Sequence, residues 1–120
     1  MGILFYGSPG MEIPFEDRAL AHLQMVMTAK LRRREGFVFS WANTRGDGSG
    51  RGAVWIDPSS TLYFEYAGST APTINREWVD VLAMSSNTPG GLLFTDEPVA
   101  TAAAAAETRA AVDTGHVPEL

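Results

Sequence analysis

The sequence contains no cysteine and no long apolar run. Without cysteine there can be no disulfide framework and no thiolate-based zinc site. No apolar run approaches the roughly 20 residues that a membrane helix needs. The segment Met1–Tyr6 also lacks the basic region with which a signal peptide begins. We therefore expect a protein without disulfides that resides in the cytoplasm and does not bind membranes.

Positive charge is scarce as well. Lys and Arg number 9 against 14 Asp and Glu, which gives a net charge of −5. Nucleic-acid-binding proteins usually present a basic face, so this balance disfavours a general nucleic-acid binder. The exception is local, because the chain's single lysine opens a basic cluster, Lys30–Arg34.

The apolar content is sufficient for one core. A length of 120 residues with 45% hydrophobic residues suits a single globular domain. Periodic apolar patterns run through residues 1–96, and we expect these residues to form one α+β domain. After Pro98 the composition becomes alanine-rich. Residues 97–120 are therefore expected to be an appendage that is helical at least in part.

Two helices are indicated by apolar residues at helical spacing. The first runs from about 17 to 34, with acidic residues at its start and the basic cluster in its last turn, where each complements the helix dipole. Gly36 is expected to cap its end. The second helix carries Trp78, and either Thr73 or Asn75 is expected to cap its start.

Three aromatic-rich runs follow the first helix, at residues 37–41, 53–56 and 62–66. Each has the two-residue period of a strand, and their short connections favour an antiparallel meander. An N-terminal hairpin of residues 2–6 and 11–15 precedes them.

These elements, with a short last strand near residue 93, predict an α+β fold in two layers. The predicted order is β-β-α-β-β-β-α-β, with a mostly antiparallel sheet and both helices on one of its faces. The predicted core consists of the large side chains that the patterns place inward: Leu20, Leu23, Met27, Leu31, Phe39, Trp41, Trp55, Phe64, Trp78 and Leu82.

The glycine-rich loop at residues 46–52 is the clearest candidate for a binding site. Its backbone amides could cradle an anion, and the loop also supplies an arginine. A strand follows it instead of a helix, which is the wrong context for a dinucleotide-binding turn. The competing interpretations are a flexible hairpin connection for the loop and a solvated helix end for the basic cluster. The candidate phosphate- or anion-binding residues are Lys30, Arg32, Arg33, Arg45, Gly48, Ser49, Gly50 and Arg51.

The patterns of known catalytic and metal-binding sites are not evident. Ser49 does not match the G-x-S-x-G elbow of hydrolases. Of the two histidines, His22 is expected to face solvent and His116 falls in the appendage. Carboxylates such as Asp57 and Glu65 show no ligand spacing. We therefore predict no catalytic residue, no metal site and no cofactor.

One ordered set of short motifs resembles a known family. The motifs are Tyr6-Gly7-Ser8, Leu20-Ala21-His22-Leu23, Lys30-Leu31-Arg32, Phe39-Ser40-Trp41, Gly48-Ser49-Gly50-Arg51, Trp55, Pro58, Gly68-Ser69 and Asn75-Arg76-Glu77-Trp78. The set is similar to that of small, uncharacterised domains of high-GC Gram-positive bacteria, and the resemblance covers residues 1–96. Proteins of this family often carry the label ATP-dependent DNA ligase, and the resemblance implies no catalytic residues.

The residues argue against ligase chemistry. Covalent nucleotidyl transfer in such ligases uses a lysine in a K-x-D-G motif. Lys30, the only lysine, is followed by Leu31, Arg32 and Arg33 instead. The first hypothesis for function is therefore a non-catalytic binding or assembly module, with a protein partner or self-association. The alternative is an accessory protein that binds nucleic acid or a nucleotide through the candidate anion-binding residues.

Overall fold

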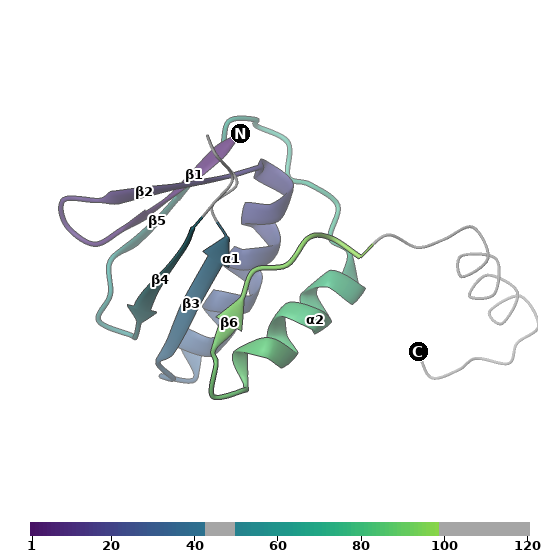
Figure 1. The fold of residues 1–120 in the computed structure, drawn as a ribbon. Helices are drawn as coiled ribbons and strands as arrows, with labels where there is room; N and C mark the ends of the chain where they lie inside the picture. Colours follow the sequence, from purple (N-terminus) through teal and green to yellow (C-terminus); the bar gives the residue numbers. More distant parts are fainter. Residues whose placement is uncertain (43–49, 99–120) are drawn as a thin grey trace, which may run out of the picture.

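The structure is a computed structural model that describes residues 1–42 and 50–98. Its elements follow the predicted order, and the fold is α+β as expected (Figure 1). None of the helices in these two ranges has the length and apolar character needed to cross a membrane. The elements are β1 (Gly2–Tyr6), β2 (Met11–Phe15), α1 (Asp17–Arg32), β3 (Phe37–Ala42), β4 (Arg51–Ile56), β5 (Leu62–Glu65), α2 (Arg76–Ser86) and β6 (Leu92–Leu93).

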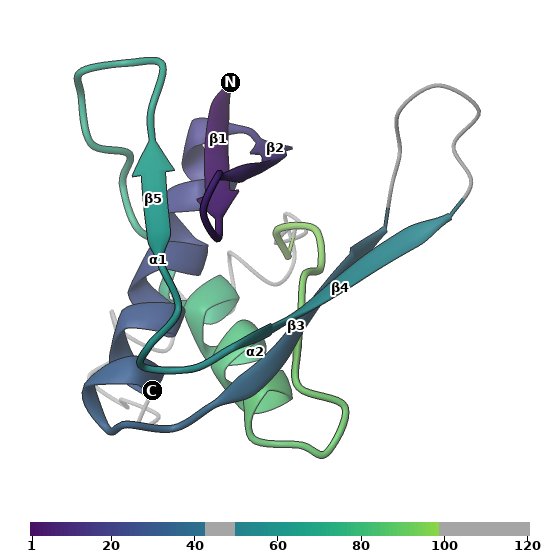
Figure 2. The ribbon, with the colours of Figure 1, turned by 90° about the vertical axis from the view of Figure 1, so that its left-hand side faces the viewer.

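The strands form two small sheets. Sheet A has the order β2-β1-β5, and sheet B has the order β4-β3-β6. All pairings are antiparallel except that of β3 with β6. Helix α1 contacts β1 and α2, while α2 also contacts β3 and β6. The hairpin of β3 and β4 projects from the body of the domain (Figure 2).

The expected meander is wrong in its last strand. Strands β3 and β4 pair as predicted, but β5 leaves them and pairs with β1, with Leu4 opposite Phe64. A turn redirects the chain after β4, because Asp57 Oδ1 accepts hydrogen bonds from the backbone and side chain of Ser59. The backbone N–H of Gly7 then donates to the carbonyl of Thr61 at 3.0 Å and aligns β5 beside β1.

Most of the predicted core is confirmed. Six of the residues expected inside are buried, and Leu31, Trp41 and Phe64 pack partly buried against them. Trp55 is the error, since 55% of it is exposed. Strand alternation explains this result, because Ile56 faces inward and its neighbour must therefore face outward. The six buried residues are Leu20, Leu23, Met27, Phe39, Trp78 and Leu82.

The helix ends are set by local chemistry. Asn75 caps α2 by accepting hydrogen bonds from the backbone N–H groups of Glu77 and Trp78. The expectation that Gly36 caps α1 is wrong. The left-handed conformation after α1 belongs to Arg34, with φ of 62°. Gly36 instead provides room for the indole of Trp55, whose Cζ2 lies 2.6 Å from where a Cβ would be.

Candidate functional site

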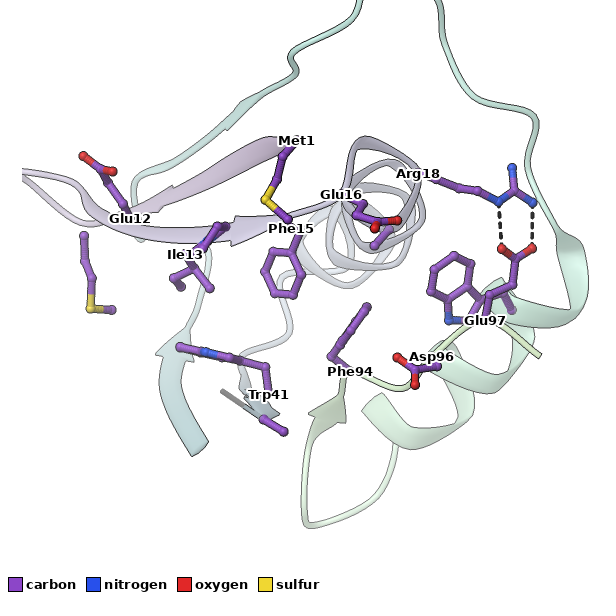
Figure 3. A pocket seen from close by; sticks show the side chains of 15 residues that line it. Met1, Glu12, Ile13, Phe15, Glu16, Arg18, Trp41, Phe94, Asp96 and Glu97 are labelled. Atoms are coloured by element: carbon purple, nitrogen blue, oxygen red, sulfur yellow. Dashed lines mark hydrogen bonds and ion pairs between the residues drawn. The ribbon is translucent and has the colours of Figure 1, made fainter. Parts of the chain in front are cut away.

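A cleft lies between β2, the end of β3 and residues 94–97, which follow β6 (Figure 3). Its volume is about 480 Å³. Strand β2 contributes one wall, and the segment after β6 contributes the opposite wall. The two walls therefore come from opposite ends of the domain sequence. Its lining consists of Met1, Met11, Glu12, Ile13, Pro14, Phe15, Glu16, Arg18, Ala19, Trp41, Ala42, Trp78, Phe94, Asp96 and Glu97.

Aromatic rings form much of the apolar lining. Phe94 packs edge-on against Phe15, with ring centroids 5.0 Å apart, and its centroid lies 6.2 Å from that of Trp78. The indole N–H of Trp78 donates to the carbonyl of Thr95 at 3.0 Å, which fixes the segment after β6 against α2. Packing and hydrogen bonding together hold these rings, so the apolar lining is preformed.

An ion pair closes one end of the cleft. The guanidinium of Arg18 donates two hydrogen bonds to the carboxylate of Glu97, at 2.8 and 2.7 Å (Figure 3). This bidentate geometry is the strongest form of a side-chain ion pair. Asn75 donates a third bond to the same carboxylate at 2.8 Å. These donors, Arg18 first, hold the pKa of Glu97 down at about 2, against an ordinary value of 4.5.

His22 helps to position the residues of this ion pair through hydrogen bonds to the backbone. The expectation that it faces solvent is wrong, because it is completely buried and its ring packs at a tilt against that of Trp78, with ring centroids 4.5 Å apart. Its Nε2 accepts the backbone N–H of Asn75 at 2.8 Å. Its Nδ1 therefore carries the proton and donates to the carbonyl of Arg18 at 2.7 Å. The ring thus joins α1 to the start of α2, the two elements that position the donors of Glu97.

Glu97→Gln should reduce stability in a pH-dependent way. The folded pKa lies below the ordinary value, so the carboxylate stabilises the fold above about pH 4.5, and this contribution is lost as the pH falls towards 2. The variant should therefore be less stable than the parent near neutral pH, and the difference should shrink across that window. Chemical denaturation at a series of pH values measures it.

Arg18→Gln gives the matched control for this prediction. It removes the other partner of the ion pair, so the double variant should cost less than the sum of the two single variants. A difference between Glu97→Gln and the parent that stays constant from pH 4.5 to 2 would contradict the role assigned to the ion pair.

The other charged side chains of the cleft are acidic. Glu12, Glu16 and Asp96 are exposed at its lining, and none of them forms an ion pair within residues 1–42 and 50–98. The only basic side chain of the lining is that of Arg18, which Glu97 already neutralises. The described lining includes no Ser, Thr, Cys, His or Lys. Its chemistry suits the binding of a cation beside an apolar group better than nucleophilic catalysis.

The predicted anion-binding residues that the structure describes lie outside the cleft, and among them Lys30 has several partners. Its side chain is only 8% exposed. The ammonium group donates to the carbonyl of Ser86 at 3.1 Å and to Oδ1 of Asn87 at 3.0 Å, and it pairs with Glu35 at 3.1 Å. Its donors thus secure the end of α2, where the helix dipole favours a cation.

The other basic candidates within the described residues do not gather at one place. Arg33 pairs with the same Glu35 carboxylate, while Arg32 is exposed at the end of α1. Arg51 is the first residue of β4, on the projecting hairpin, and Gly50 precedes it. The structure therefore does not bring Arg51 to the α1 cluster. Three candidates lie outside the described residues, namely Arg45, Gly48 and Ser49.

The residues of the cleft were missed by sequence reasoning for a clear reason. Arg18 and Glu97 are 79 positions apart, and neither belongs to a motif. The sequence feature that could have indicated the cleft is the acidic pair Asp96-Glu97, three positions after the short apolar strand β6. Within the described ranges, no three His, Asp or Glu side chains are grouped so that they could hold a metal ion.

Of the comparisons with known proteins, the one with family models finds a match for this domain. No curated protein and no solved structure matches the chain. One family does match, over residues 1–97, so its match ends at the residue that closes the cleft. That family is described as "Domain of unknown function (DUF7882)", and the chain belongs to it.

Proposed function

We propose that the domain is a non-catalytic binding module whose cleft takes a segment of a partner protein. The observation that carries the proposal is the combination of an apolar cleft of about 480 Å³ with three acidic side chains that form no ion pair within the described ranges. This volume lies within the range of about 300–1,000 Å³ typical of binding pockets. The aromatic lining is held in place by its own packing, which limits the entropy lost on binding.

Charge complementarity indicates the chemistry of the partner. A lysine or arginine side chain can lay its apolar stem along aromatic rings while its charged end reaches a carboxylate. Here the partly exposed Trp41 and Phe94 offer the rings, and the carboxylates come from Glu12, Glu16 and Asp96. The segment that fits best therefore carries a basic residue next to apolar ones. Binding of this kind is weakened by salt.

The edge of β2 limits the way in which the segment binds. In the described sheet β2 pairs only with β1, so its other edge has no strand partner. Exposed edges can accept a further strand, but Pro14 lacks the N–H that a continuous ladder requires. Recognition should therefore depend on side chains in the cleft more than on backbone pairing along β2.

Peptides that alternate arginine and leucine should bind the full chain, whereas matched peptides of glutamate and leucine should not. Fluorescence anisotropy with labelled peptides measures both. Reversing two charges of the cleft with Glu12→Lys and Asp96→Lys should weaken binding by at least about tenfold, because like charges then oppose the peptide.

The control changes net charge equally at a distance from the cleft. Glu65→Lys with Asp80→Lys alters two exposed carboxylates, on β5 and α2, that do not line the cleft. This variant should retain binding within about twofold, since distant surface charges are screened. Equal losses in both double variants would refute the site, and equally tight binding of free arginine would indicate a small-cation pocket in place of a peptide site.

A further inference from the structure

The outer face of sheet B carries mostly apolar or small side chains and is uncovered in the described parts of the chain. Alternation and register place two groups of residues on it, from β3 and β4, together with one residue of β6. We call this surface the B face. It consists of Val38, Ser40, Ala42, Arg51, Ala53, Trp55 and Leu93. Helix α2 packs on the other side of the sheet, where Phe39 and Leu92 are buried.

Trp55 is held rigidly on the B face although 55% of it is exposed. Its indole N–H donates to Oδ2 of Asp57 at 3.0 Å, and the far side of the ring lies over Gly36. A side chain fixed at both ends loses little rotamer freedom when a partner covers it. Rigid exposed tryptophans are therefore well suited to anchor a protein interface.

Charge is distributed along the B face with opposite signs at its two ends. Arg51 lies at one end of β4, and the carboxylate of Asp57 lies beside Trp55 at the other. Ala53 and Ser40, which face each other across the ladder, occupy the middle with small side chains. The face thus has a cation, a flat small-residue centre, and an aromatic ring with an anion, in that order.

We propose that the B face binds the B face of a second copy of this chain. The twofold axis passes through the centre of the interface. It lies between the two sheets, parallel to them and perpendicular to the strands, so the two copies of β4 run antiparallel. Arg51 of each copy then lies against Trp55 and Asp57 of the other copy. A guanidinium over an indole is a favourable cation–π contact, and the carboxylate adds an opposite charge. The small residues at the centre allow the two sheets to approach closely.

This contact is self-complementary, as a twofold interface must be. Both of its charge contacts are attractive only when the β4 strands of the two copies run in opposite directions. The parallel arrangement would instead oppose arginine to arginine. The inference concerns a surface separate from the cleft and stands independently of the peptide-binding proposal.

Sedimentation velocity of the full chain at increasing concentration should show a monomer–dimer equilibrium. Trp55→Arg should abolish the dimer, because each new arginine would face Arg51 of the other copy. Arg51→Glu should also abolish it, by placing a carboxylate against Asp57. The control is Tyr63→Arg, since Tyr63 is equally exposed, at 56%, but lies on β5 in sheet A. The Tyr63→Arg variant should dimerise as the parent protein does.

Mixing the two monomeric variants provides the decisive experiment. In a mixed pair, Glu at position 51 of one copy faces Arg at position 55 of the other, and the second contact keeps its original partners. The mixture should therefore form a dimer that neither variant forms alone. Each variant should also keep the melting temperature of the parent protein within a few degrees, which shows that it is folded. A strictly monomeric parent, a dimer that survives Trp55→Arg, or a mixture that stays monomeric would overturn the proposal.

Discussion

Replacing Phe39 with alanine should lower the free energy of unfolding by about 3–5 kcal/mol. Phe39 is completely buried at the centre of β3. Its ring lies 6.0 Å from that of Phe15 in sheet A and 5.3 Å from that of Trp41 in sheet B. Truncation would open a cavity where the two sheets meet. Since small domains are stable by only about 5–15 kcal/mol, much of the stability would be lost.

Val38→Ala is the matched control for this prediction. Val38 is the preceding residue of the same strand but points to the opposite, partly exposed face. Its truncation should cost about 1 kcal/mol or less, because it removes less area and leaves no enclosed cavity. Urea denaturation of the two variants compares them directly. Equal costs would mean that the assignment of inner and outer faces in sheet B is wrong.

Gly91→Ala should cost about 2–4 kcal/mol, because two unfavourable terms add. Gly91 has φ of +82°, a conformation that L side chains rarely adopt. An added Cβ would lie 2.3 Å from the carbonyl oxygen of Val38, which belongs to the backbone and cannot rotate away. Relieving this clash would push β6 from its place beside β3 and disturb the segment that leads to the cleft.

The neighbouring glycine provides the control. A Cβ at Gly90 would meet nothing closer than Oγ1 of Thr88 at 3.8 Å, and its φ is not positive. Gly90→Ala should therefore change the melting temperature little, or raise it slightly through reduced freedom of the unfolded chain. Thermal unfolding followed by circular dichroism distinguishes the two variants. Similar effects at both positions would contradict the described path between α2 and β6.

The sequence predicts the elements of this fold well because their signals are local. The stripe of α1, the cap at Asn75 and the alternation of β3 each depend on residues a few positions apart. The partner of β5 is not predictable in this way. Its pairing with β1 depends on a turn at Asp57 and on a bond between Gly7 and Thr61, which no short pattern contains.

The roles of polar side chains were the least predictable feature. Lys30 and His22 both sit on α1, four positions to either side of the buried Val26, so they share one side of the helix. Both are buried because α2 packs against that side and supplies partners: Ser86 and Asn87 for the lysine, and Asn75 for the histidine. Burial of such groups depends on partners from distant segments, so composition and periodicity cannot reveal it.

The candidate site follows the same rule. Its walls come from β2 and from residues 94–97, which are at opposite ends of the domain sequence. Each contributes acidic and apolar residues that look ordinary in isolation. Only the folded arrangement gathers them into one cleft, and only there does the ion pair of Arg18 with Glu97 leave the other three carboxylates as the dominant charge.

The most direct test of the proposed binding function is an NMR titration that follows the three tryptophan indoles. Trp41 and Trp78 line the cleft, whereas Trp55 lies on the B face. Adding the arginine–leucine peptide at constant protein concentration should shift the indole N–H signals of Trp41 and Trp78 and leave that of Trp55 unchanged. Backbone amides of residues 11–16 and 94–97 should shift with them. A shift confined to Trp55, or no shift at saturating peptide, would contradict the assignment of the cleft as the binding site.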